Sequence, residues 1–197
     1  MSIVLVGSTS GSVTLQEPAV AGTTVLTLPA VTGTVLTSAS TGISASNITT
    51  GTLPAAQAVS GSIIQVAQYL NYTYASTTDS TFAASGYSVV ITPKFASSTM
   101  LIRCAISASQ SASNGAGYFT IYKNGSNLAG ASGYNTLYSN ATFSNPLRVG
   151  IPIEITNAAG GTSAITYEIY FKTNTVGTVA MNQDSSATSI TVMEIAA

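Results

Sequence analysis

The sequence predicts an all-β protein in which an N-terminal β stem, intertwined with copies of the same chain, is followed by an antiparallel, jelly-roll-like β-sandwich head. Apolar and polar residues alternate along many short segments, and no long stretch has the spacing of an amphipathic helix. Gly or Pro interrupts these segments roughly every ten residues, as is typical of antiparallel sheets. All 15 Tyr and Phe lie between Tyr69 and Phe171. Because aromatic side chains contribute strongly to a core, we expect only the C-terminal part to fold around a core of its own.

Residues 1–37 contain short strand-like segments separated by Pro and Gly. The tetrapeptide Thr-Val-Leu-Thr occurs at 24–27 and again at 34–37. Three such strands comprise about 30 residues, which is fewer than an independent domain usually needs. We therefore expect the apolar side chains of this stem to pack against copies of the same chain: Val13, Leu15, Val25, Leu26, Leu28, Val35 and Leu36.

Residues 38–62 form an extended linker rich in Ser, Thr and Gly. Ile43, Ile48 and Leu53 recur at a spacing of five, which fits neither a helix nor a strand. One interpretation is a flexible connection. The other is an extended thread wound with two sister chains, in which these three side chains face inward and continue the trimer stem.

Residues 63–197 are predicted to form the head. Strands are expected at 63–72, 87–91, 100–107, 118–123, 147–155, 165–172, 178–182 and 189–195. Both 147–155 and 165–172 carry aliphatic residues on one face, and a Gly-rich turn joins them, which predicts an antiparallel hairpin. Asn124-Gly125 predicts another tight hairpin. Pro152 indicates an edge strand or a bulge, and the alternation of Met100, Ile102, Cys104 and Ile106 predicts a buried thiol.

The composition excludes several classes of function. Five basic and six acidic residues give a net charge of −1, which is too little positive charge for nucleic-acid binding. The chain has no His and one Cys, which excludes His-dependent catalysis and sites built from several His or Cys. No run of about 20 apolar residues suits membrane insertion, and the start lacks the basic residues of a secretory signal. No cofactor is expected.

The acidic residues do not form a persuasive catalytic or metal-binding pattern. Glu154 and Glu168 lie on the polar faces of strands predicted to be adjacent, where they could form a glycosidase pair. Arg148 and Lys172 share those faces, which favours a solvated charge pattern instead. No segment clusters carboxylates in the way a Ca²⁺ loop requires. We therefore predict a protein without catalytic or metal-binding residues.

The best candidate for recognition is the segment 129–140, which is predicted to be a loop. It mixes Tyr and Asn with small residues. Tyr supplies a large contact area and Asn supplies adaptable hydrogen bonds. The candidate receptor-facing residues are Tyr134, Asn135, Tyr138 and Asn140. The alternative is that the two tyrosines only cover the end of the sandwich.

Several segments carry a family resemblance. Gly-Ser-Val-Thr-Leu-Gln-Glu-Pro at 11–18 and Gly-Thr-Val-Leu-Thr at 33–37 are followed by Ser-Asn-Ile-Thr-Thr-Gly-Thr-Leu-Pro at 46–54. The head adds Ile-Tyr-Lys-Asn-Gly at 121–125 and Thr-Ser-Ile-Thr-Val-Met-Glu-Ile at 188–195. Together these segments resemble bacteriophage fibre proteins, especially those of cyanophages. The N-terminal match is the more specific, and the match to a fibre tip is looser.

The resemblance implies a homotrimeric virion protein, assembled in the host cytoplasm, whose N-terminus is held by capsid or tail proteins. A short apolar end suits pairing with a partner strand, so Ile3, Val4, Leu5 and Val6 are the expected virion anchor. The chain lacks a long shaft, which favours a short head fibre, a decoration protein or a small tail fibre. Two roles follow: attachment to a host-surface glycan or protein, or decoration that stabilises the capsid without binding a receptor.

Overall fold

The computed structural model describes residues 3–6, 9–10, 12–15, 59–139, 146–174 and 176–197. The chain divides into two compact units, Met1–Gly51 and Thr52–Ala197, which are described separately. Most of the predicted stem lies outside the described residues: Val25, Leu26, Leu28, Val35, Leu36, Ile43, Ile48 and Leu53.

The described part of the first unit is a short antiparallel pair of strands. β1 (Ile3–Val6) pairs with β2 (Ser12–Leu15), so that Ile3 lies opposite Leu15 and Val6 lies opposite Ser12. One of the strand-like segments expected within residues 1–37 is therefore a strand, Ser12–Leu15. The predicted anchor residues form the whole of β1, and the side chain of Val6 is exposed.

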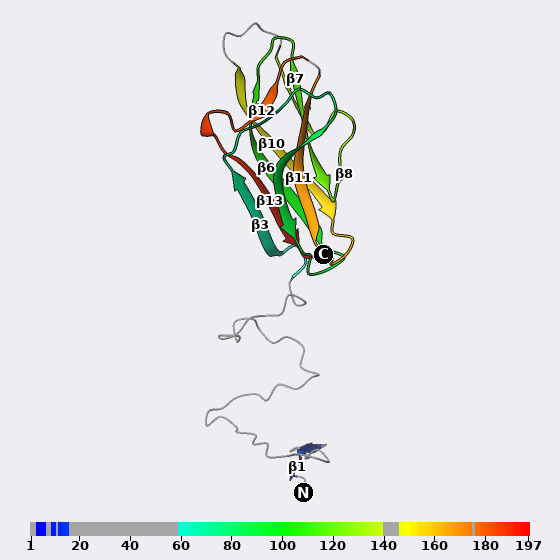
Figure 1. The fold of residues 1–197 in the computed structure, drawn as a ribbon. Helices are drawn as coiled ribbons and strands as arrows, with labels where there is room; N and C mark the ends of the chain where they lie inside the picture. Colours follow the sequence, from blue (N-terminus) through cyan, green and yellow to red (C-terminus); the bar gives the residue numbers. More distant parts are fainter. Residues whose placement is uncertain (1–2, 7–8, 11, 16–58, 140–145, 175) are drawn as a thin grey trace. The chain divides into compact units, whose positions relative to one another are not determined.

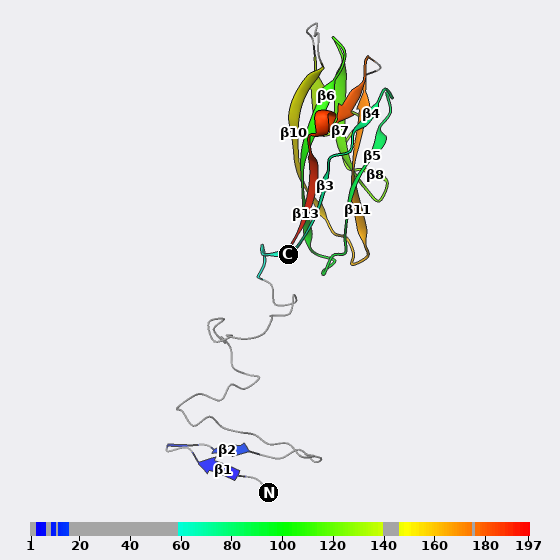
Figure 2. The same cartoon turned by 60° about the vertical axis from the view of Figure 1, so that its left-hand side comes forward.

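The second unit is a β-sandwich of two antiparallel sheets (Figures 1 and 2). In the six-stranded sheet, β6 (Thr99–Gln110) pairs along its whole length with β10 (Leu147–Ala158). The other edge of β6 pairs with β12 (Val179–Met181) and β13 (Thr188–Ile195), which follow one another along it. β3 (Ile63–Asn71) lies beyond β13, and β4 (Ala75–Thr77) lies beyond β12.

The second sheet has five strands. β11 (Ile165–Thr173) lies between β5 (Ala83–Ile91) and β7 (Ala116–Lys123). The outer edge of β7 pairs with β8 (Ser126–Asn127) and β9 (Asn135–Tyr138). The described residues contain no α-helix, and one 3-10 turn, η3, spans Gln183–Ser185.

The strands pair in a nested order that is typical of a jelly roll. β3 pairs with β13, β5 with β11, β6 with β10, and β7 with β9. The first strands of the unit therefore pair with its last strands, and each later pair lies nearer the middle of the sequence. A long hairpin folded over into two sheets gives this order. The predicted antiparallel β-sandwich is confirmed.

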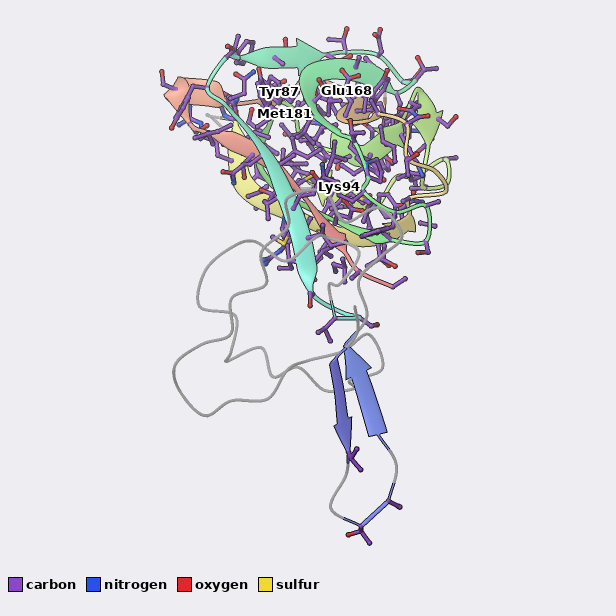
Figure 3. All side chains as sticks on the ribbon, turned by 90° about the horizontal axis from the view of Figure 1, so that it is seen from below. Tyr87, Lys94, Glu168 and Met181 are labelled. Carbon is purple, nitrogen blue, oxygen red and sulfur yellow. The ribbon has the colours of Figure 1, made fainter. Side chains whose placement is uncertain are left out.

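The core lies between the two sheets because side chains alternate along each strand. On β6 the predicted series Met100, Ile102, Cys104 and Ile106 is buried. The facing strand β11 buries every second side chain from Ile165 to Thr173. Figure 3 views the sandwich from below and shows side chains filling the space between the sheets, where Tyr87 and Met181 are buried.

The predicted hairpin between 147–155 and 165–172 is wrong. β10 pairs with β6 in one sheet, whereas β11 pairs with β5 and β7 in the other. Both strands present one aliphatic face, and the two faces enter the same core cluster from opposite sheets. The Gly-rich connection crosses from one sheet to the other. A hydrogen bond from the Ala159 N–H to the Ser98 carbonyl, 2.9 Å long, fixes its start.

Two smaller predictions are confirmed. Asn124 and Gly125 join β7 to β8 with φ values of 48° and 80°, the positive angles that a two-residue hairpin turn requires. Pro152 lies in β10, which has β6 as its one partner strand among the described residues and so is an edge strand. A proline is tolerated there because the missing N–H costs no ladder hydrogen bond.

Candidate functional site

The outer face of the five-stranded sheet gathers aromatic side chains. Because Tyr167, Ile169 and Phe171 of β11 point into the core, the intervening residues Glu168, Tyr170 and Lys172 point outward. On β7, Tyr118 and Tyr122 lie directly opposite Lys172 and Glu168. We call the following side chains the aromatic surface: Phe82, Tyr118, Tyr122, Tyr138 and Tyr170.

Four of the five rings of the aromatic surface are ordered by contacts with one another or with Lys172. Tyr122 and Tyr170 stack with centroids 3.7 Å apart and planes 13° apart, and the edge of Phe82 meets Tyr122 at 6.4 Å. The ammonium group of Lys172 lies 4.7 Å from the Phe82 centroid and 5.1 Å from the Tyr118 centroid. Such cation–π contacts stabilise both the charge and the ring orientation. The surface is therefore preorganised before any partner binds.

Polar groups frame the rings. Glu168 accepts a hydrogen bond from the Gly86 N–H at 3.1 Å, and Thr120 donates its hydroxyl hydrogen to Asn127 Oδ1 at 2.6 Å. Burial, followed by the charge of Glu168, raises the pKa of the Tyr170 hydroxyl, which therefore stays a neutral donor at physiological pH. Flat apolar rings beside hydroxyl, amide and charged groups suit a ligand that has both C–H faces and hydroxyls.

The predicted recognition loop is partly wrong, because its second half is strand β9. Tyr134 donates its hydroxyl hydrogen to the Leu128 carbonyl at 2.8 Å, and the Asn135 side chain donates to the Pro152 carbonyl at 3.1 Å. These hydrogen bonds hold both side chains in place on the head. Tyr138 lies on β9, 58% exposed, in the same sheet as Tyr118, and Asn140 lies outside the described residues.

Sequence reasoning missed four members of the aromatic surface, although a signal was present. Tyr118 and Tyr122 lie four residues apart in one predicted strand, and Tyr170 occupies the outward face of another. An alternating pattern of this kind puts them on the same face as soon as the two strands are known to be neighbours. Phe82 carries no such signal, because it precedes its strand β5.

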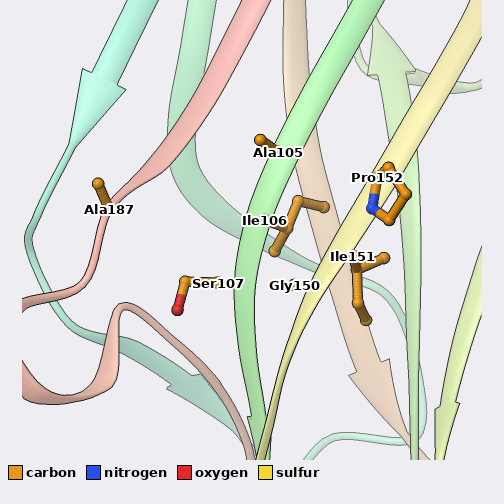
Figure 4. A pocket seen from close by; sticks show the side chains of 7 residues that line it. All are labelled: Ala105, Ile106, Ser107, Gly150, Ile151, Pro152 and Ala187. Atoms are coloured by element: carbon orange, nitrogen blue, oxygen red, sulfur yellow. The ribbon is translucent and has the colours of Figure 1, made fainter.

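The outer face of the six-stranded sheet has a different character. A shallow depression of about 350 Å³ lies over β6 and β10 (Figure 4). Its outward side chains are small, and none is aromatic: Ala105, Ser107, Gly150, Pro152 and Ala187. The neighbouring hollow of about 420 Å³ contains Arg103 and Glu154, which form an ion pair with each other at 2.7 Å. The charged side chains that line these two hollows, Arg103 and Glu154, are thus already paired with each other.

The two carboxylates considered for catalysis are not neighbours. Glu154 lies on the outer face of the six-stranded sheet, whereas Glu168 lies on the outer face of the five-stranded sheet. The core separates them, so they cannot flank one glycosidic bond. Within the described parts of the chain, no group of three or more His, Cys, Asp or Glu residues could hold a metal ion. Nor does that part of the chain include a helix long and apolar enough to cross a membrane.

Comparison with known proteins gives little further information. No protein-family model and no curated protein sequence matches the chain. Among solved structures, the chain is similar to the infectious bursal disease virus VP2 subviral particle, with a TM-score of 0.36 and 15% sequence identity. The similarity covers 69% of this chain and 39% of the VP2 chain, so the chain spans about two-fifths of the length of VP2.

Proposed function

We propose that this chain is a virion structural protein, a short homotrimeric fibre whose sandwich head attaches the particle to a host surface. The fibre assignment is supported by the segments 11–37 and 46–54, which resemble bacteriophage fibre proteins. The N-terminal residues, including β1, would join capsid or tail proteins, since a short apolar strand can pair with an exposed sheet edge. The head has a core of its own.

The observation that carries the attachment role is the aromatic surface. Five aromatic rings lie on this outer face, whereas the depression over β6 and β10 on the other outer face is lined by small side chains and contains no aromatic ring. A sugar ring packs its C–H face against an aromatic ring, while its hydroxyls hydrogen-bond to neighbouring polar groups. We therefore favour a host-surface glycan as the partner.

Avidity would allow weak contacts of single heads to attach the particle to the host surface. A single preorganised face of this size binds a sugar weakly, because the surface is open and not a closed pocket. Three heads on one fibre, and several fibres on one particle, convert later contacts into intramolecular events. The head binds and performs no chemical step in this proposal.

The test measures adsorption of particles that carry variants of the aromatic surface. Replacing Tyr122 and Tyr170 together by Ser should lower adsorption at least about tenfold, and Tyr138→Ser should lower it by a smaller factor. Val149→Ser is the matched control, because Val149 is 40% exposed and lies on the other sheet. Melting curves of the purified chains establish that each variant is folded.

Unchanged adsorption of the folded double variant would contradict the attachment role. If particles without the protein also adsorb normally but lose resistance to heat or osmotic shock, the protein is a capsid decoration that stabilises the shell.

A further inference from the structure

The first strand of the head exposes an unusual amount of apolar surface. Six large apolar side chains of this region are each between 38% and 59% exposed. We call them the β3 side: Ile63, Val66, Tyr69, Leu70, Tyr72 and Tyr74. They belong to β3 or to the segment that follows it, and β5 is the neighbouring edge strand of the other sheet. Gln65 links the two edges by donating to the Thr92 carbonyl at 2.6 Å.

The backbone of β3 is also unprotected. Among the described residues its one partner strand is β13, so the other edge of all nine residues is open. Sheet edges that stay in solvent are usually blocked by charge, proline or a bulge. The opposite edge strand, β10, has such protection in Arg148, Pro152 and Glu154. β3 has neither proline nor charge, and its one shift of register lies at Ile64, near the start of the strand. The edge from Gln65 to Asn71 therefore has none of these protections, which indicates that it is covered in the assembled protein.

The charge pattern favours a second copy of this chain as the cover. Residues 59–78 contain no charged residue. Identical surfaces can therefore meet here without like-charge repulsion. About half of each of the six side chains is exposed, which amounts to apolar area on the order of 500 Å² per copy. A stable interface needs about 800 Å² per partner, so the β3 side supplies more than half of this requirement.

Chain connectivity points to the same partner. Nine residues lie between Leu53, the last predicted stem residue, and Ile63 at the start of β3. A connection of that length spans at most about 35 Å. Copies joined in a stem would therefore hold their β3 strands at a high local concentration.

We infer that the β3 side is the surface through which the heads of neighbouring copies contact one another. This inference rests on the proposed trimeric fibre and adds the contact surface of its heads. The interface leaves the aromatic surface available for attachment, because none of its side chains belongs to β3 or to the segment that follows it.

Disulfide trapping in the full chain tests the inference. Val66→Cys, Leu70→Cys and Tyr72→Cys are made one at a time and oxidised, with Val149→Cys as an exposed control on the β10 edge. The native Cys104 is 5% exposed and should not form a disulfide between chains. We expect at least one of the three variants to give a covalent dimer in more than half of its chains, whereas Val149→Cys gives less than a tenth. Adding Leu70→Lys to Tyr72→Cys should abolish the dimer, and adding Val149→Lys should leave it unchanged.

The outcomes separate this inference from the proposed function. If the wild-type chain has the mass of a trimer but all three variants behave like Val149→Cys, another surface or the chain's own N-terminal residues cover the β3 side. The inference is then wrong and the trimer stands. If the wild-type chain is a monomer, the trimeric fibre itself is wrong and the inference falls with it.

Discussion

At the scale of single residues, Glu194 shows how the core accommodates a charge. It lies on the core face of β13, in series with Ile190 and Val192, and it is fully buried. Its carboxylate accepts hydrogen bonds from the Lys94 N–H at 2.8 Å, the Phe95 N–H at 3.1 Å and the Gln65 side chain at 2.6 Å. Burial by itself would raise the pKa of Glu194, but the neighbouring Ser98 side chain and these hydrogen bonds outweigh it and the pKa is lowered. The carboxylate thus fixes the segment that carries Lys94, labelled in Figure 3.

Glu194→Gln should lower the free energy of unfolding at neutral pH by about 2 kcal/mol, because an amide NH₂ would face donors in place of an acceptor oxygen. Urea denaturation measures the change. Glu154→Gln is the control, since it breaks an exposed ion pair with Arg103 and should cost less than about 1 kcal/mol. Equal costs for the two substitutions would contradict this role of Glu194.

The same carboxylate predicts the response to acid. Its pKa is lower in the folded chain than its usual value of 4.5. Its contribution to stability is therefore fully present above that value and is lost as the pH falls through the folded pKa. Between about pH 5 and pH 3, the urea midpoint of the wild-type chain should fall further than that of Glu194→Gln. Parallel curves would show that another group causes the acid response.

Cys104 gives a second prediction at this scale. Burial raises the pKa of its thiol to about 12. At pH 8 only about one thiol in ten thousand would be ionised, and the thiolate is the reactive form. The native chain should therefore react with a thiol reagent at least a hundredfold more slowly than the chain in urea. Rapid reaction without denaturant would mean that the strand β6 opens readily.

At the scale of elements, the sequence predicted which segments form strands better than it predicted their partners. Alternation at 147–155 and 165–172 identified both strands and their buried faces. It could not decide whether the strands lie side by side or face each other across the core, because both arrangements bury the same aliphatic residues. β9 was missed because four residues, Asn135–Tyr138, with one core side chain, Leu137, give too weak a pattern.

The turn between β7 and β8 is the element whose sequence signal was strongest, and it can be tested directly. Gly125 has a φ of 80°, so Gly125→Ala should cost about 1 kcal/mol through backbone strain alone, since no atom lies within 4 Å of the added Cβ. Gly150 on the edge strand β10 has equally open space and no positive φ. Gly150→Ala should therefore change the free energy of unfolding by less than about 0.5 kcal/mol, and a loss equal to that of Gly125→Ala would contradict the strain argument.

At the scale of the whole molecule, the structure shows which surface is poorest in charge. Only 6% of residues are charged, and none lies between 59 and 78, where the apolar edge of the head is most exposed. The sequence alone indicated that much of the chain faces copies of itself. It could not show the β3 side or the aromatic surface, because each combines residues from strands that become neighbours only in the folded sandwich.

The mass of the chain in solution is the most direct test of the proposed trimer. Three copies of the 19.9 kDa chain give a trimer of about 60 kDa. Mass photometry or sedimentation equilibrium at micromolar concentration should find this species, with little monomer. A single species at the monomer mass over the whole concentration range would contradict both the trimeric fibre and the contact between heads at the β3 side.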